Sequence, residues 1–459
     1  MQDAAGEVEL RDDEGGIRPE FLHAVVAALD AGEAANLREL TLPLHGADLA
    51  DLIELLRPEQ RATLIATLGE DLDASALPEL DEPVRDQVLE VMPAAQVAEA
   101  LQQLDSDDAV YLIEDLDEEE QSDILAKLPR FERLALERSL EYPEDSAGRI
   151  MQTDLIAAPP FWSVEQTIDY MRDADDLPDR FYEIFVVDPA YHLLGSVALS
   201  HLLRSKGATL IDSITERDIH PIPVEADQEA VARQFERYNL TSAPVVDGGG
   251  RLVGVITADD VVEVVQEEAS EDILHMGGVA GESVSDSVWR TASHRFTWLL
   301  ANLVTAIIAS VVISLFEATI EQMVALAVLM PIVASMGGNA GTQTMTVAVR
   351  ALATQDLGPA NALRVISRES AVGLLNGLLF AVIMAAIAFF WFGSGELGAV
   401  IAVAMIVNLL AAALAGILIP LGLHALGLDP AIASGVFVTT VTDVVGFFAF
   451  LGLAALWLV

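Results

Sequence analysis

Five long apolar segments in the C-terminal part of the chain constrain the fold more than any other feature. They lie at residues 296–316, 322–349, 370–392, 397–423 and 431–459. The first has 21 residues, and at about 1.5 Å per residue it spans about 30 Å, the thickness of the hydrocarbon core of a bilayer. Each segment is therefore predicted to cross a membrane as a helix.

Charge is concentrated in the other part of the chain. Residues 1–289 carry 64 of the 71 acidic residues and 19 of the 24 basic ones. A surface this acidic repels nucleic acid and anionic headgroups, so the predicted partners are cations and the lipid bilayer, and no nucleic acid. Because cysteine is absent, oxygen atoms are the abundant metal ligands, and these suit Mg²⁺ and Ca²⁺.

The basic residues near the apolar segments predict the orientation. Arg290 and Arg295 precede the first segment, and Arg350, Arg364 and Arg368 lie between the second and third. The start of the chain shows no basic stretch followed by an apolar core, so no signal peptide is predicted. By the positive-inside rule, the protein is expected in the cell (plasma) membrane with a cytoplasmic N-terminus and the C-terminus outside.

The acidic half divides into two predicted domains after a flexible N-terminus at residues 1–20. Within residues 21–145 an apolar residue recurs every twelve positions, which predicts a small α-solenoid of short helices rather than a loose bundle. These residues are Leu44, Leu56, Leu68, Leu80, Met92, Leu104, Leu116 and Leu128.

Residues 146–257 contain an internal duplication of alternating helices and β-branched runs. Phe185-Val186-Val187-Asp188 in the first copy matches Pro244-Val245-Val246-Asp247 in the second, with seven residues from Asp to the next strand's Gly in each. The repeated pattern resembles a tandem pair of CBS domains, which are α+β regulatory modules. An acidic connecting helix at 258–280 then leads to the five-helix, all-α transmembrane domain at 281–459.

Asp443 is predicted to be the only acid deep within a membrane segment. An ionised carboxylate in hydrocarbon costs at least about 2.5 kcal/mol, so it must face water, a cation or a partner. A protonated Asp443 bonded to a neighbouring helix is the alternative, and the other segments offer no base to pair with it. The carboxylate is therefore predicted to line a cation pathway.

The second segment is predicted to be a broken, pore-facing helix. It contains Pro331 and the run Gly337-Gly338-Asn339-Ala340-Gly341-Thr342-Gln343, and backbone exposed at membrane depth must line a cavity or pack on protein. Close helix packing through Gly337 and Gly341, as with Gly373 and Gly377, explains the spacing equally well. The amide side chains of Asn339 and Gln343 favour the pore-facing interpretation. The candidate pore ion site comprises Asp443, Asn339, Gln343, Gly338 and Thr440.

The whole arrangement resembles the MgtE family of magnesium channels. The resemblance rests on the order of domains, the run from Gly338 to Gln343 and the Thr-rich helix of Asp443, and it covers almost all of the chain beyond the first twenty or so residues. It implies a homodimer with a pore on the two-fold axis and Asp443 facing the ion. It also implies regulatory Mg²⁺ ligands, and with Asp259 of the connecting helix the predicted set is Asp227, Glu229, Asp259, Asp260, Glu263, Glu268, Glu271, Asp272 and Asp429.

The predicted function is a Mg²⁺-selective channel that imports Mg²⁺ and closes when cytosolic Mg²⁺ binds the acidic residues. Some family members have an Asp followed by an aromatic that stacks adenine, whereas this chain has Asn239 and Leu240 at those positions. The resemblance therefore does not imply ATP as a ligand of the CBS pair. Two alternatives stay open: a cation-coupled carrier for Mg²⁺, Co²⁺ and Mn²⁺, or a membrane-tethered nucleotide sensor without transport. No enzyme is predicted, because no activated nucleophile or phosphate-binding loop is found.

Overall fold

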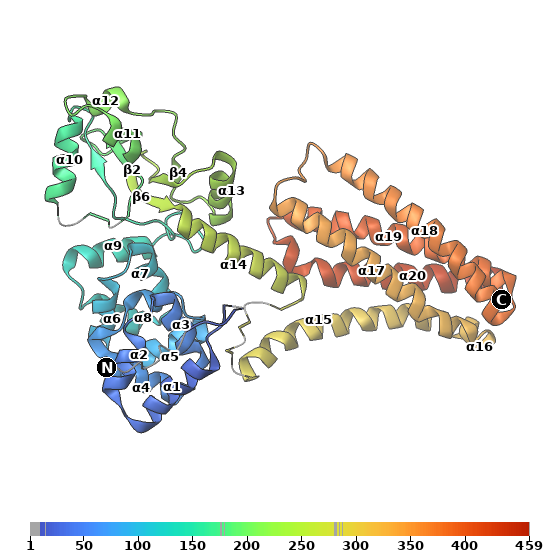
Figure 1. Ribbon diagram of the computed structural model, residues 1–459. Coiled ribbons are helices and arrows are strands. Elements are labelled where there is room, and N and C mark those ends of the chain that lie inside the picture. Colours follow the sequence, from blue (N-terminus) through green and yellow to red (C-terminus); the bar gives the residue numbers. More distant parts are fainter. Residues whose placement is uncertain are drawn as a thin grey trace. The chain divides into compact units, whose positions relative to one another are not determined.

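The computed structural model describes residues 10–458 except 14, 175, 176, 179, 280, 281, 284 and 287, and it does not describe the side chain of Ala433. Residues 1–9 of the predicted flexible N-terminus, which covers residues 1–20, lie outside the described residues. The chain forms two compact units (Figure 1): residues 1–267 with 283–285, and residues 268–282 with 286–459.

Short helices of the first unit follow the predicted twelve-residue period. From residue 46 onward, successive α-helices start twelve residues apart, except that a 3₁₀ turn occupies the start expected at residue 70. The helical elements are α1 Pro19–Ala31, α2 Ala34–Thr41, α3 Gly46–Leu55, α4 Pro58–Leu68, η1 Gly69–Asp71, η2 Ala74–Ala76, α5 Glu82–Val91, α6 Ala94–Leu101, α7 Ser106–Ile113, α8 Glu118–Leu125 and α9 Arg130–Leu140.

The apolar residues that set this period hold the turns between helices against one core. Leu56, Leu68, Leu80, Met92 and Leu128 are buried in it. The other three, Leu44, Leu104 and Leu116, are partly buried and pack against it. Because every repeat buries the same position, each helix ends and the next begins at a constant interval.

Two three-stranded sheets show that the predicted duplication is structural. In each, the first pair of strands is parallel and the second antiparallel. Val186 pairs with Gly195, Val245 pairs with Gly254, and the register shifts at the following residue in both sheets. The strands are β1 Ala157–Ala158, β2 Glu183–Val187, β3 Leu193–Ala198, β4 Ile222–Pro223, β5 Ser242–Val246 and β6 Leu252–Thr257.

Side-chain caps start the main helix of each copy. Ser163 and Gln166 form a capping box at one helix, and Asp227 accepts a hydrogen bond from the N–H of Ala230 at the other. The acidic connecting helix follows the second sheet, and it begins in the first unit and ends in the second. These helices are α10 Val164–Asp173, α11 Leu199–Arg204, α12 Ile211–Ile214, α13 Gln228–Tyr238 and α14 Ala258–Met276.

Five helices of the second unit are long and apolar enough to span a membrane, as predicted; the count refers to the described residues. Four of them, α17 to α20, pack against one another, and α15 contacts α20. A shared core includes Leu326, Val333, Leu409 and Phe450. The helices are α15 Val288–Ser314, the short α16 Glu317–Gln322, α17 Ala325–Ala353, α18 Ala362–Phe392, α19 Gly395–Ala425 and α20 Pro430–Trp457.

The predicted break in the second membrane segment is wrong, because α17 is one continuous helix although it contains Pro331. A Cβ on Gly337 would lie 2.3 Å from Nδ2 of Asn408, and a Cβ on Gly341 would lie 2.5 Å from Cγ1 of Val438. These glycines therefore allow α17 to approach α19 and α20 closely. The close-packing interpretation explains them.

The second small-residue pair packs in the same way. A Cβ on Gly373 would lie 2.6 Å from the Cβ of Ala413, and one on Gly377 would lie 3.0 Å from the Cα of Ile406. Both contacts join α18 to α19. Small residues thus set the distances between the membrane helices.

We expect Gly416→Ala to destabilise the membrane unit by about 1 to 3 kcal/mol. An added Cβ would lie 2.7 Å from the backbone oxygen of Gly341 and 2.8 Å from the Cβ of Thr344, and neither atom is on a flexible chain end. Gly422→Ala is the matched control, since nothing lies within 4 Å of that position. Thermal unfolding of the detergent-purified protein measures both, and equal melting temperatures would contradict the packing argument.

Candidate functional site

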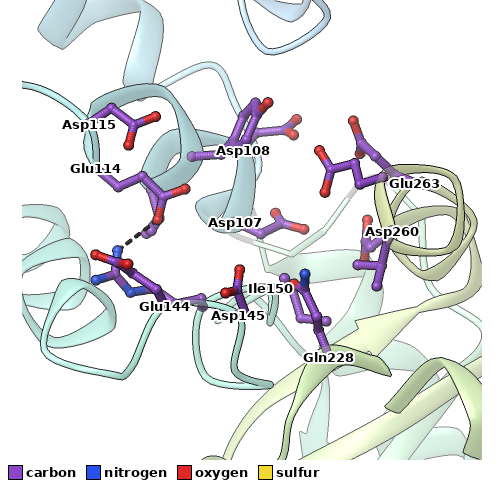
Figure 2. A pocket seen from close by; sticks show the side chains of 15 residues that line it. Asp107, Asp108, Glu114, Asp115, Glu144, Asp145, Ile150, Gln228, Asp260 and Glu263 are labelled. Atoms are coloured by element: carbon purple, nitrogen blue, oxygen red, sulfur yellow. Dashed lines mark hydrogen bonds and ion pairs between the residues drawn. The ribbon is translucent and has the colours of Figure 1, made fainter. Parts of the chain in front are cut away.

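An acidic pocket of about 250 Å³ lies within the first unit, where α7, the segment after α9 and the start of α14 meet (Figure 2). Of the described residues that line it, Arg149 is the only base, and nine are carboxylic acids. The acids are Asp107, Asp108, Glu114, Asp115, Glu144, Asp145, Asp260, Glu263 and Glu267. So large an excess of negative charge in one cavity favours a bound cation.

Two of the acids stand in the first turn of α7. Ser106 holds this turn in place, because its Oγ accepts a hydrogen bond of 2.7 Å from the N–H of Thr153. Oδ1 of Asp107 is buried, and no described group donates a hydrogen bond to it. A buried oxygen without a donor is costly, so this carboxylate is suited to receive a cation. Its neighbour Asp108 lines the same pocket.

The opposite wall is formed by the first turns of α14, and Figure 2 shows Asp260 and Glu263 facing the acids of α7. Oδ2 of Asp260 accepts hydrogen bonds from the N–H and the hydroxyl of Thr257, at 3.1 and 2.8 Å. Nε2 of Gln152 lies 3.4 Å from the same oxygen. The local turn therefore positions Asp260, whereas Glu263 lies nearly one turn further along the helix.

Two arginines neutralise only a small part of the charge. Arg149 forms an ion pair of 2.8 Å with Glu114 and also donates to the backbone oxygens of residues 140 and 142. Arg85, a buried residue of α5, forms an ion pair of 2.6 Å with Asp115, and its guanidinium lies 4.4 Å from the ring centre of Tyr111. Neither ion pair includes an acid from the first turn of α7 or from α14.

The pKa values of the pocket acids respond to this crowding. Burial, and then the charges of Asp260 and Asp108, raise the pKa of Asp107 well above its ordinary value. Burial, followed by the charge of Glu263, raises the pKa of Asp108 to about 7. Burial also raises the pKa of Asp260 and of Glu263. Bringing these carboxylates together therefore costs free energy unless protons or metal ions compensate the charge.

We expect the metal-free protein to lose stability as the pH rises from about 4 to above 7. The folded state raises the pKa of Asp108, so it holds this proton more tightly than the unfolded state does. The contribution is fully present below the unfolded pKa and is lost as pH rises through the folded value of about 7, with a slope of up to about 1.4 kcal/mol per pH unit.

Thermal unfolding of metal-free protein between pH 5 and 8 measures this dependence. Asp108→Asn should flatten the profile and raise the melting temperature at pH 8, and added Mg²⁺ should do the same for the natural sequence. Asp123→Asn is the control, since that exposed acid pairs with Lys127 outside the pocket. An unchanged profile in the Asp108 variant would contradict the titration argument.

The predicted regulatory ligands of the first unit separate into two groups. Asp260 and Glu263 line the pocket. Asp259 is exposed and competes with Asp260 for the single hydrogen of the Thr257 hydroxyl. The remaining two are engaged elsewhere: Asp227 caps α13, and Glu229 pairs with Arg233 at 2.7 Å. Their assignment as ligands stays a prediction.

Sequence reasoning missed seven of the nine pocket acids. The six acids within residues 107–115 and 144–145, and Glu267 on α14, were not among the predicted ligands. The run Asp105-Ser106-Asp107-Asp108 has no special signal in a domain so rich in acids. Only the contact between this turn and α14 distinguishes it from other acidic turns.

The other predicted ligands lie in the second unit. Glu268, Glu271 and Asp272 are on the last turns of α14, and Asp429 caps α20 by accepting a hydrogen bond of 2.7 Å from the N–H of Ala431. In the described part of the chain, no three carboxylate or imidazole groups already surround one metal position. Acids spread over a cavity suit an ion that keeps its water, as Mg²⁺ does.

Asp443 lies half-buried on α20, and within the described residues no hydrogen bond or ion pair engages its carboxylate. The hydroxyls of Thr439, Thr440 and Thr442 each donate to backbone oxygens of their own helix, at 2.6 to 3.1 Å. That Asp443 is the only acid deep in a membrane helix stays a prediction. The third helix starts earlier than predicted and also contains buried Glu369.

The predicted amides of α17 lie on an exposed face. Asn339 and Gln343 are both exposed in the single chain, and Nδ2 of Asn339 lies 3.5 Å from Oγ of Ser335. Gly338 is partly exposed with open space beside it. A row of polar groups on a membrane helix is unfavourable against lipid, so this face requires water or protein.

The cleft between the two sheets of the first unit is small. It is lined by residues including Asp154, Phe181 and Ser242, and its volume is about 20 Å³, which is room for about one water molecule. A nucleotide would require the cleft to open.

Fold and site together define a multi-pass membrane protein that transports cations and has cytosolic N-terminal domains. The comparisons with known proteins agree with this class. Family models described as a divalent cation transporter, an MgtE intracellular N domain and a CBS domain match residues 330–453, 44–145 and 211–267.

Two similar relatives are both described as the magnesium transporter MgtE. The one from Thermus thermophilus is 33% identical over 94% of this chain and 97% of its own length. The one from Bacillus subtilis is 28% identical over 95% of this chain and 97% of its own. A crystal structure described as the cytosolic domain of the Mg²⁺ channel MgtE in complex with ATP is 30% identical over 53% of this chain and 99% of its own, with a TM-score of 0.48. The chain belongs to the MgtE family of magnesium transporters.

Proposed function

We propose that this chain forms a homodimeric Mg²⁺-selective channel that imports Mg²⁺ across the plasma membrane and closes when cytosolic Mg²⁺ binds its acidic domains. The observation that carries the regulatory part is the acidic pocket, whose buried Asp107 oxygen has no described hydrogen-bond donor. Mg²⁺, instead of ATP, is the proposed regulator, because Asn239 and Leu240 stand where some family members have an Asp followed by an aromatic that stacks adenine.

The pathway would run along α17 and α20. Asp443 supplies the charge, and the exposed amides of Asn339 and Gln343, with the backbone at Gly338 and the hydroxyl of Thr440, supply polar groups. Mg²⁺ sheds its water reluctantly. Two carboxylates from two copies of the chain could attract the hydrated ion while amides and hydroxyls bond its water. The C-terminus then lies outside the cell.

The gate follows from repulsion within the pocket. Two carboxylates about 6 Å apart repel by roughly 0.7 to 3 kcal/mol at effective dielectric constants between 80 and 20. Several such pairs supply about 5.5 kcal/mol, enough to move a two-state equilibrium from mostly closed to mostly open. When cytosolic Mg²⁺ is low, repulsion separates α7 from α14, and when it is high, bound ions bridge them.

The connecting helix carries this change to the membrane. It begins with pocket acids, and at its other end Met276 packs against Met345 and Val349 of α17 and against Ala431 and Val438 of α20. A shift of α14 therefore reaches the two helices of the proposed pathway.

Limited proteolysis of the purified chain across a Mg²⁺ titration tests the gate. We expect cleavage in the acidic half to slow as Mg²⁺ rises, because bound ions join the pocket walls. Na⁺ at equal ionic strength is a control for screening. A cleavage rate indifferent to Mg²⁺ would remove the gating proposal.

Electrical recording separates a channel from a cation-coupled carrier. Single-channel currents that appear without any gradient of Na⁺ or H⁺ support the channel. Strict dependence of Mg²⁺ flux on such a gradient would instead favour the carrier.

A further inference from the structure

Asn408 is a buried polar side chain of the membrane unit that the proposed function does not use. It lies on α19 and is fully buried, and its helix neighbours Met405 and Leu409 belong to the apolar core. Its Nδ2 donates a hydrogen bond of 2.7 Å to the backbone oxygen of Val333 on α17. An amide is costly to bury among apolar side chains, so its presence at this position calls for a reason.

The hydrogen bond to α17 fixes the direction in which the amide points. Only the nitrogen of an amide donates, so Nδ2 of Asn408 faces the oxygen of Val333 and Oδ1 is turned elsewhere. Oδ1 is buried, and no described group donates a hydrogen bond to it. The amide is therefore held by its nitrogen alone, and stability from hydrogen bonding does not fully explain why it is there.

Two glycines from different helices make room for this amide. A Cβ on Gly446 of α20 would lie 2.8 Å from Nδ2 of Asn408 and 3.0 Å from its Oδ1. A Cβ on Gly337 of α17 would also lie 3.0 Å from Oδ1 and closer still to Nδ2. Any residue larger than glycine at either position would displace the amide. Asn408 thus fills a space between α17 and α20 that only glycines leave open.

The two glycines adjoin residues of the proposed pathway. Asn339 follows Gly337 by two residues on α17, and Asp443 precedes Gly446 by three residues, nearly one turn, on α20. Both glycines are buried, whereas Asn339 is exposed and Asp443 is half-buried. Asn408 therefore lies against the buried side of the two helices that carry the polar groups of the pathway.

We propose that Asn408 is a positioning residue that sets the spacing between α17 and α20, and with it the selectivity of the pathway for hydrated Mg²⁺. The amide is carried by α19, bonded to α17 and enclosed by Gly446 of α20. A site that selects a hydrated ion needs its polar groups at a fixed separation, so a changed spacing admits other ions. The effect on selectivity rests on the proposed function, whereas the packing of the three helices does not.

The test compares two variants of the full-length protein. Asn408→Ala removes the hydrogen bond and leaves a cavity, and Asn408→Ala combined with Gly446→Ala returns a methyl group to that space without the hydrogen bond. Mg²⁺ and Na⁺ fluxes into proteoliposomes are measured together with the melting temperature. We expect the ratio of Mg²⁺ to Na⁺ flux to fall at least about tenfold in both variants, while the double variant recovers at least half of the loss in melting temperature.

Met384→Ala is the matched control, because it also removes a buried side chain from the membrane core but lies on α18. It should lower the melting temperature and keep the natural flux ratio. A natural flux ratio in the double variant would overturn the proposal, because filling the space would then be enough. That variant also decides the matter if Asn408→Ala fails to fold.

This result is separable from the permeation proposal. Natural Mg²⁺ flux in Asp443→Asn would remove the assignment of Asp443 to the pathway, yet the flux ratios of the Asn408 variants would still report whether the amide controls selectivity. A natural ratio in the Asn408 variants together with lost flux in Asp443→Asn would remove only the role of Asn408.

Discussion

Asp443→Asn abolishes Mg²⁺-dependent growth when the chain is expressed in a transport-deficient bacterium, if this carboxylate lines the pathway as proposed. Removing one negative charge about 6 Å from a divalent ion costs at least about 1.4 kcal/mol even at the dielectric constant of water. This is a factor of about ten in ion occupancy for each copy of the chain. Growth at limiting Mg²⁺ and flux into proteoliposomes measure the loss.

The variant must reach the membrane for this result to count, so its amount and its melting temperature are measured beside growth. Thr439→Val is the control on the same helix, since that hydroxyl only bonds the backbone of its own helix. Wild-type flux in the Asp443 variant would eliminate the permeation proposal. A sensor without transport predicts instead that neither the natural sequence nor the variant carries Mg²⁺ flux.

Asp260→Asn combined with Glu263→Gln flattens the Mg²⁺ dependence of closure, and because the neutral side chains no longer repel, the gate closes at Mg²⁺ concentrations at least about tenfold lower. These two acids form the α14 wall of the pocket, so their loss removes both the repulsion that opens the gate and the ligands that close it. With weak sites acting together, losing two ligands shifts the midpoint and flattens the response. Proteolysis protection and channel current against cytosolic Mg²⁺ measure both quantities.

Asp123→Asn combined with Glu137→Gln removes the same charge from exposed acids that pair with Lys127 and Arg133, outside the pocket. This control should close at the natural Mg²⁺ concentration. If both double variants shift equally, net charge and not the pocket governs closure. If neither shifts, the regulatory ions bind elsewhere.

Much of the fold could be predicted because its signals are local and repeated. The twelve-residue spacing from Leu44 to Leu128 appears as the spacing of helix starts, and the matching strands around Val186 and Val245 have the same register. Length and hydropathy alone predict five membrane helices. The spacing of glycines was ambiguous, because a pore-facing break and close packing use the same residues.

The acidic pocket was predicted only in part, because the acids that line it come from segments far apart in the sequence. Asp260 and Glu263 were found through the resemblance of the connecting helix, but their partners Asp107 and Asp108 are acids among many in the helical domain.

The sequence by itself determined that the chain crosses a membrane, that its charge lies in the domains before the membrane, and that one carboxylate, Asp443, sits in an apolar helix. Such properties follow from composition and periodicity along neighbouring residues. Only the tertiary structure decided which acids share a cavity and that Gly337 and Gly341 pack against α19 and α20. Burial, charge repulsion and contact act through distances in space, and these distances are set by packing between segments far apart along the chain.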